Sequence, residues 1–209
     1  MKIVFRIAAL MISAISTNLH SAPHCGELTI AYGETGGDYT NSEHRKYKLP
    51  IVEKFHFTPN VENLIKGNSG HLGGELTYTL ERFPNHHRAL VSFAKLGLRD
   101  KTPKPIGSRF SVECAFDRAI RYKPGDGMVR MIYGNYLTKL GKNGEALEQL
   151  KEAISLQPED PTINYNLGLL YMQKKDYEQA KTYAKKAYEL GFPLPGLKNQ
   201  LMQAGKWED

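Results

Sequence analysis

Apolar and small residues recur along the C-terminal part of the chain at a spacing of 34 positions. The paired positions are Gly134 and Gly168, Ala146 and Ala180, Ala153 and Ala187, and Leu156 and Leu190. Around the first members of these pairs, Leu147, Leu150 and Ile154 follow the spacing of one helix face, and charged residues occupy the other face. Small residues suit places where two helices approach closely, so the pattern predicts repeated pairs of packed helices.

Prolines extend this pattern toward the N-terminus. Pro158 closes a unit at 127–160, and Pro124 lies 34 residues earlier. The apolar residues before the two prolines match in offset: Phe116, Ala119 and Ile120 correspond to Leu150, Ala153 and Ile154. We therefore expect an earlier pair of helices at 86–98 and 110–122, with Asn85 as the N-cap of the first and a long loop between them.

Two further helices complete the predicted stack. Pro84 stands 40 residues before Pro124, which is one repeat plus six inserted residues, so 72–83 is interpreted as the second helix of a truncated unit. Downstream, 197–204 is expected to form the solitary helix that covers the end of a solenoid.

The most regular stretch identifies a family resemblance. The run Tyr165-Asn166-Leu167-Gly168-Leu169-Leu170-Tyr171, followed by Asp176-Tyr177, Ala180 and Ala187, is similar to the consensus of the tetratricopeptide repeat (TPR). The resemblance implies an all-α solenoid of helix–turn–helix units at 71–209, with about three repeats, a half-repeat and a capping helix. It also implies a protein that presents a surface to a partner and is not an enzyme.

Residues 23–70 do not fit the repeat and are expected to form an irregular N-terminal arm. Within this arm, 49–57 is mostly apolar and is interpreted as a short strand or a docking segment. Thr58 and Pro59 predict a short helix that runs to Lys66 and stops at Gly67. The arm either packs along the first repeats or contributes to a binding pocket.

The first residues resemble a secretory signal peptide. Lys2 and Arg6 flank an apolar run at 7–15, which is followed by small and polar residues. This run is too short to span a bilayer comfortably. We therefore expect a signal peptide at 1–22, with its cleavage point left open, a periplasmic or secreted mature protein, and no stable membrane insertion after cleavage.

Export changes the interpretation of the two cysteines. Cys25 and Cys114 are the only ones in the chain, and an even number in an oxidising compartment favours a disulfide. The competing interpretation leaves Cys114 as a buried thiol and Cys25 free.

Charge and length add limits. The formal charge of +6 becomes +4 without Lys2 and Arg6, and lysines and glutamates intermix along the predicted helices. Nucleic-acid binding is therefore not expected, because no arginine-rich stripe with interleaved aromatic residues is present. We expect one domain that acts as a monomer.

The distribution of histidines is the one feature that points to a metal-binding or catalytic site, since all seven lie at or before His87. A metal site would need His56 or His71 to fold back beside His86 or His87, together with a carboxylate such as Glu53 or Glu75. The sequence contains no HExxH motif and no Cys/His pair at ligand spacing, so structural roles are favoured and no metal or other cofactor is expected.

Two functions follow. In the first, the chain is an exported TPR adaptor or scaffold that binds a protein or peptide in its concave groove, which in such solenoids is lined by the first helix of each unit. The expected groove residues are Met128, Met131, Asn135, Thr138, Lys139, Thr162, Tyr165, Asn166, Leu169, Met172 and Gln173. In the second, the histidine-bearing N-terminal part is a metal-binding or catalytic module that the repeats support.

The resemblance also suggests, and then weakens, one specific mode of binding. Asn135 and Asn166 resemble the asparagines with which some TPR proteins clamp a C-terminal carboxylate. The basic residues of that clamp are missing, because Met131, Gly196 and Gln200 occupy their positions.

Overall fold

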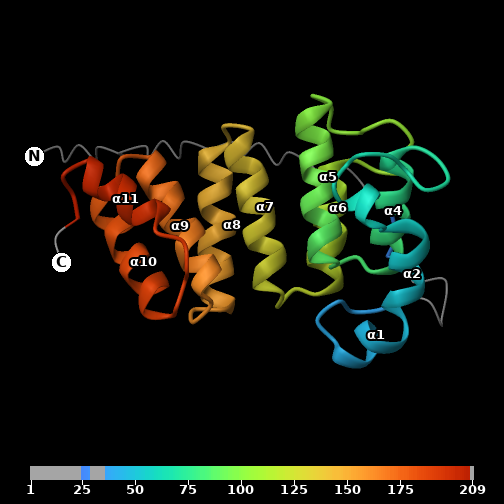
Figure 1. Cartoon of the computed structure of the whole chain (residues 1–209), viewed down its shortest axis with the longest axis horizontal. Helices are drawn as coiled ribbons and strands as arrows, with labels where there is room; N and C mark the ends of the chain where they lie inside the picture. The colour runs from blue at the N-terminus through green and yellow to red at the C-terminus, as the bar shows by residue number, and fades with distance from the viewer. Residues whose placement is uncertain (1–24, 29–35, 208–209) are drawn as a thin grey trace, which may run out of the picture.

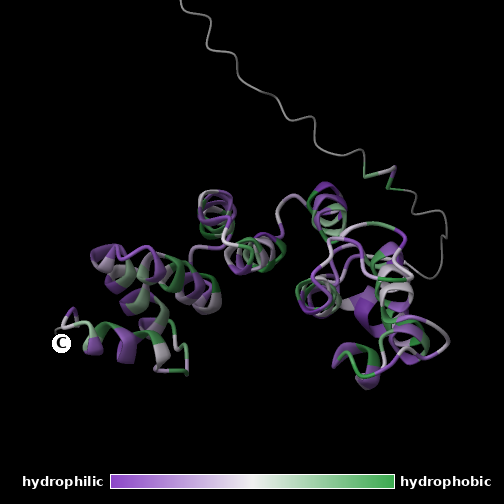
Figure 2. Ribbon diagram, turned by 90° about the horizontal axis from the view of Figure 1, so that it is seen from above, coloured by the Kyte–Doolittle hydropathy of each residue, from purple (hydrophilic) through white to green (hydrophobic). Residues whose placement is uncertain are grey.

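The computed structural model describes residues 25–28 and 36–207, and all of its regular structure there is helical. The helices are α1 (Ser42–Tyr47), α2 (Leu49–His56), α3 (Pro59–Glu62), α4 (Leu72–Arg82), α5 (His87–Arg99), α6 (Val112–Tyr122), α7 (Gly127–Lys139), α8 (Asn143–Leu156), α9 (Pro161–Gln173), α10 (Tyr177–Glu189) and α11 (Gly196–Gln203). They stack in chain order from α2 and α4 at one end to α11 at the other (Figure 1). Seen from above, the stack follows a curved path (Figure 2). The prediction of an all-α solenoid is confirmed.

The two C-terminal repeats are tight helix pairs, α7 with α8 and α9 with α10. Their close approach depends on the small residues of the 34-residue pattern. A Cβ atom added at Gly134 would lie 2.7 Å from Leu150 Cγ of α8, and one added at Gly168 would lie 3.3 Å from the carbonyl oxygen of Ala180 in α10. Asp126 and Asp160 cap the first helices by accepting hydrogen bonds from backbone N–H groups.

The preceding pair, α5 and α6, lies within one or two residues of the predicted bounds. Its connection at 100–111 is long, and Lys101 takes a left-handed conformation there (φ 51°). The N-cap prediction for α5 is wrong: His86 caps the helix by accepting a hydrogen bond from the N–H of Ala89. Asn85 is fully buried instead.

Both ends of the solenoid are covered. At the C-terminal end α11 buries Leu197 and Leu201 completely, so the expected capping helix is present. At the N-terminal end α4 packs between α2 and α5, in the place of the predicted half-repeat. One hydrophobic core runs through the stack from Phe57 to Leu201.

The N-terminal arm is more regular than its sequence predicts. Residues 49–57 do not form a strand, because α2 occupies Leu49–His56. Its Leu49 and Val52, three positions apart, pack against Phe83, which agrees with the alternative of a docking segment. The third helix of the arm is shorter than expected. It ends at Glu62, since Leu64 adopts a left-handed conformation (φ 56°).

Candidate partner-binding groove

Three cavities lie in a row along the first helices of the repeats. The N-terminal cavity, of about 440 Å³, lies between the arm, α5 and α7. The central cavity, of about 390 Å³, lies between α5, α7 and the start of α9. The C-terminal cavity, of about 570 Å³, lies between α7, α9 and α11. Adjacent cavities share lining residues, so together they form one open groove, which we call the concave groove.

Ten of the eleven residues expected in the groove line it. These are Met128, Met131, Asn135, Thr138, Lys139, Thr162, Asn166, Leu169, Met172 and Gln173. The exception is Tyr165, which lines none of these three cavities. Its ring stacks on Phe192 at 4.0 Å between centroids and meets Tyr188 edge-on, so it packs the C-terminal segment onto α9.

Sequence reasoning missed the contribution of α5. Val91, Lys95 and Leu98 line the groove, and they precede Met131, Asn135 and Thr138 by 40 residues each. This is the same offset as that between Pro84 and Pro124. The groove residues of α5 could therefore have been predicted by applying the 40-residue offset to those of α7. The arm adds Tyr39, Glu62 and Asn63, and α11 adds Gln200.

The central cavity is apolar at its floor and basic at its rim. Met131, Ile132 and Tyr136 are each less than a tenth exposed and form the floor. The hydroxyl of Tyr136 donates a hydrogen bond to Glu113 of α6 (3.1 Å), away from the groove helices. Burial, together with the negative charge of Glu113, raises the pKa of Tyr136 and keeps the phenol neutral. Lys95 and Lys139 are exposed at the rim.

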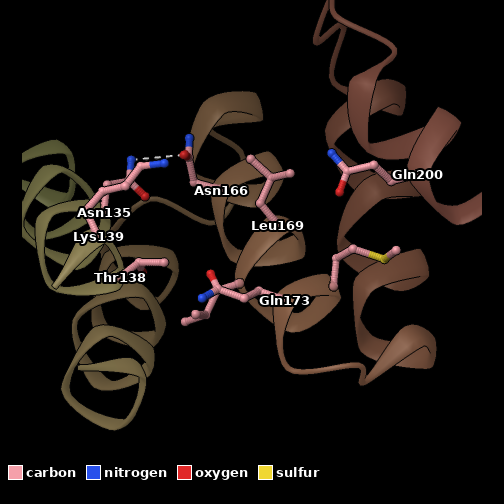
Figure 3. Close-up of a pocket in the computed structure, with 9 residues that line it drawn as sticks. Asn135, Thr138, Lys139, Asn166, Leu169, Gln173 and Gln200 are labelled. Atoms are coloured by element: carbon pink, nitrogen blue, oxygen red, sulfur yellow. Dashed lines mark hydrogen bonds between the residues drawn. The ribbon is translucent and has the colours of Figure 1, made fainter. Parts of the chain in front are cut away.

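The C-terminal cavity combines side-chain amides and Thr138 with the apolar side chains of Leu169, Leu170 and Met172 (Figure 3). Asn135 Nδ2 donates to Asn166 Oδ1 (2.9 Å) and contacts Met131 Sδ (3.3 Å). Asn166 Nδ2 in turn donates to the carbonyl of Thr162 (2.8 Å). The two asparagines therefore link α7 to α9 by a side-chain hydrogen bond. Gln173 and Gln200 lie on either side of Leu169 in the close-up.

Comparisons with known proteins agree with this architecture. A family model described as TPR repeat matches residues 134–180, which include the C-terminal part of α7, all of α8 and α9, and the start of α10. The chain carries tetratricopeptide repeats. A search of curated proteins finds no match.

One solved structure shares the fold of this chain. A structure titled as a functional characterisation of Pseudomonas aeruginosa PilF is similar to this TPR chain, with a TM-score of 0.54 and 23% identity over 78% of this chain and 70% of that one. A structure titled MamA MSR-1 C2 is similar with a TM-score of 0.45 and 19% identity, over 68% and 74% of the two chains.

A buried polar cluster joins the arm to the TPR helices at the N-terminal end of the groove. Asn85 is its centre. The side-chain oxygen of Asn85 accepts a hydrogen bond from the N–H of Tyr39 (2.9 Å), and its nitrogen donates to Asp38 (2.8 Å) and Asp126 (3.0 Å). A single amide thus links the arm, the start of α5 and the start of α7, and we call this set the junction cluster.

The residues that follow Asn85 extend the junction cluster. His86 is fully buried, with its ring stacked 4.3 Å from that of Tyr39. Because its Nδ1 accepts from the N–H of Ala89, its Nε2 carries the proton and donates to Glu53 (3.1 Å). Burial lowers the pKa of His86 despite the nearby carboxylate of Glu53, so the neutral form is favoured. Arg88 forms ion pairs with Glu53 and with Glu62.

The histidines proposed as weak metal ligands are kept apart. His56 contacts Glu75 (2.7 Å), His86 contacts Glu53, and His87 contacts Asp126 (2.9 Å). Each therefore has its own carboxylate partner. Over residues 25–28 and 36–207 no group of three or more potential ligands is placed to hold a metal ion.

Cys25 and Cys114 form a disulfide, as the sequence predicts. It ties the segment at 25–28 to α6. Two arginines of α6 support this attachment: Arg118 donates to the carbonyls of Cys25 (3.3 Å) and Glu27 (2.8 Å), and Arg121 donates to that of Gly26 (3.0 Å).

The expected signal peptide at 1–22 lies outside the described residues. Among the helices that are described, none is long and apolar enough to cross a bilayer.

Proposed function

We propose that the protein is a non-enzymatic adaptor that binds an extended segment of a partner protein in its concave groove. The continuity of the three cavities along α5, α7 and α9 carries this proposal. An extended chain rises about 3.3 Å per residue, so a groove that crosses three first helices at 8–10 Å spacing accepts a segment of several residues. TPR proteins generally mediate protein–protein interaction, which agrees with this use of the groove.

The lining favours protein as the ligand. Flexible methionines such as Met128 and Met172 can adapt to apolar side chains, and the amides of Asn135 and Gln173 can hydrogen-bond to a peptide backbone. The residues that line the groove include no nucleophile paired with a base. The described residues thus support binding better than catalysis.

The test is a cross-linking pull-down with two variants of the full chain. Leu169→Glu with Met172→Glu introduces two charges into the half-exposed wall of the C-terminal cavity. Lys151→Glu with Ser155→Glu also introduces two glutamates, on the exposed face of α8 outside the groove, with a charge change at least as large. Circular dichroism establishes that both variants fold.

We expect the groove variant to lose the partners that the wild type and the α8 variant both retain. Anchor residues at an interface contribute about 2 kcal/mol or more, which corresponds to a loss of roughly thirtyfold in affinity. Recovery of the same proteins by all three forms would rule out the groove as the binding surface.

We also propose that the mature protein works outside the cytoplasm. The signal-like N-terminus and the disulfide support export, because disulfides persist in oxidising compartments. Cell fractionation with N-terminal sequencing tests this proposal. Recovery of an intact N-terminus from the cytoplasm would contradict it.

The alternative of a metal-binding or catalytic N-terminal module has less support. Its candidates His56, His86 and His87 are divided among three carboxylates, and two of them hold the junction cluster together. Metal analysis of the purified protein decides the question, and a stoichiometric metal would revive this alternative.

A further inference from the structure

Carboxylates are segregated to one side of the solenoid. The helices that line the concave groove, α5, α7, α9 and α11, contain no aspartate or glutamate within their bounds. Their partner helices are rich in them, with Glu113 and Asp117 in α6, Glu145, Glu148 and Glu152 in α8, and Glu178 and Glu189 in α10. Among the described residues, Glu62 of the arm is the one carboxylate that lines these cavities, and it pairs with Arg88, which also pairs with Glu53.

Two lysines of the groove form no direct ion pair with any described residue, although the charge of Lys95 is felt by the carboxylate of Glu62. Lys95 of α5 and Lys139 at the end of α7 both line the central cavity, and Lys139 also borders the C-terminal one. Within the described part of the chain, no carboxylate lies within ion-pair distance of either ammonium group. Elsewhere on the solenoid, Lys123 and Lys186 do have acidic partners. The groove therefore presents positive charge that is available to a ligand.

The positive charge surrounds an apolar floor. The side chains of Met131, Ile132 and Leu98 lie in the same cavity as the two lysines. A ligand that satisfies both features carries an apolar side chain for the floor and carboxylates beside it for the rim.

The C-terminal cavity offers uncharged hydrogen-bonding groups, and Lys139 is the charged residue in its lining. Because Asn135 Nδ2 is already engaged with Asn166, its side-chain oxygen remains to accept from a peptide N–H. Gln173 and Gln200 have side-chain amides without a hydrogen-bond partner among the described residues. These groups suit a peptide backbone, whose donors and acceptors alternate.

We propose that the concave groove selects an acidic peptide segment, in which an apolar side chain enters the central cavity and flanking aspartate or glutamate residues pair with Lys95 and Lys139. The backbone of the segment then continues over the amides of the C-terminal cavity. This inference rests on the proposed function, since it names the chemistry of the partner for the same groove.

A random peptide library displayed on phage tests the proposal, with the full mature chain as the target. Three forms are compared: the wild type, Lys95→Glu with Lys139→Glu, and the control Lys104→Glu with Lys151→Glu. The control changes net charge by the same amount at exposed positions outside the groove. Selected peptides are then synthesised, and their affinities are measured by calorimetry at low and physiological salt.

We expect the wild type and the control to enrich peptides with an apolar residue between acidic ones. The variant with Lys95→Glu and Lys139→Glu should bind those peptides at least tenfold more weakly and should enrich basic sequences in their place. Affinity for the wild type should fall as salt rises, because exposed charge pairs are screened.

The outcomes separate the two proposals. Enrichment of neutral or basic peptides by the wild type, or equal binding of acidic peptides by all three forms, overturns the acidic preference but leaves the groove as a peptide site. Absence of enrichment with any form counts against peptide binding itself, and the acidic preference then falls with it.

Discussion

The two C-terminal TPR units and the N-terminal part of the chain are stabilised by different kinds of contact. In the C-terminal units, small residues such as Gly134 and Ala146 let helices meet, and buried leucines fill the space between them. In the N-terminal part, a buried amide and a buried histidine join segments that are far apart in sequence, and a disulfide adds a covalent link. The first kind of contact is apolar and repeats along the chain. The second is polar, occurs once, and includes a titratable histidine and a reducible disulfide.

Breaking the covalent link should have the largest effect. A disulfide between positions 89 apart in sequence stabilises a fold by roughly 4 to 5 kcal/mol in the chain-entropy model. We expect reduction, or Cys25→Ser with Cys114→Ser, to lower the melting temperature and to expose the arm to protease while α7 to α10 remain protected. A non-reduced digest analysed by mass spectrometry should show the two cysteine peptides joined.

Alkylation of both thiols in native, unreduced protein would contradict the disulfide. Equal loss of protection in both regions on reduction would contradict the difference between them.

A cavity in the C-terminal units should have the next largest effect. Leu150 is fully buried against Gly134, so Leu150→Ala should reduce the free energy of unfolding by about 3 kcal/mol. Because no ionisable group is involved, this loss should be the same at pH 5.5 and pH 7.5. Denaturant titrations at the two pH values measure it, with the exposed Ser155→Ala as a control that changes little. A loss that varies with pH would argue against a purely apolar origin.

Lowering the pH should destabilise the N-terminal part, with a smaller change in the free energy of unfolding than in the two preceding predictions. Since the pKa of His86 is lower in the folded protein than its ordinary value of 6.5, the unfolded chain takes up the proton first as pH falls. The free energy of unfolding therefore decreases below about pH 6.5, by at most about 1.4 kcal/mol per pH unit for one group. His86→Asn keeps an N-cap acceptor and removes this titration.

Hydrogen exchange at pH 7.5 and 5.5 compares the wild type with His86→Asn. The wild type should lose protection in the arm on acidification, and the variant should lose less. An identical response in the two proteins would exclude His86 as the cause.

Two carboxylates predict a second, more acidic step in the same region. Burial alone would raise the pKa of Asp38 and of Glu75, but hydrogen bonds outweigh it and hold both pKa values below their usual range. The bonds to Asp38 come from Lys123, Thr40 and Asn85, and those to Glu75 come from Ser69 and His56. Their stabilisation is present above about pH 4.5 and is lost as pH falls through the folded-state pKa values.

The same difference explains what the sequence could predict. In a repeat, the same pattern of buried positions occurs in each unit. Leu150 and Ala184, 34 residues apart, therefore identify two corresponding helices and the faces that they bury. The groove positions followed from that register, and Val91 and Lys95 would have followed as well had the 40-residue offset been applied to them.

Single contacts give no such signal. Nothing in the local sequence of Asn85 indicates that it bridges Asp38 and Asp126, which are 47 and 41 residues away. The helix at Leu49–His56 was missed for a related reason: its short apolar run fits a strand as well as a helix, and only packing against Phe83 distinguishes them. Tyr165 was misjudged because its partner Phe192 comes from the segment that follows α10.

The attachment of Cys25 to α6 has a consequence for orientation. No residue of α6 lines the concave groove, so the covalent anchor and the arginines beside it hold the start of the described chain on a different surface from the ligand. The point from which any upstream segment departs is therefore Cys25 itself, which is bonded to α6 and not to a groove helix. A label or an immobilising tag placed there should leave the groove accessible, which makes that end the suitable handle for surface-based binding measurements.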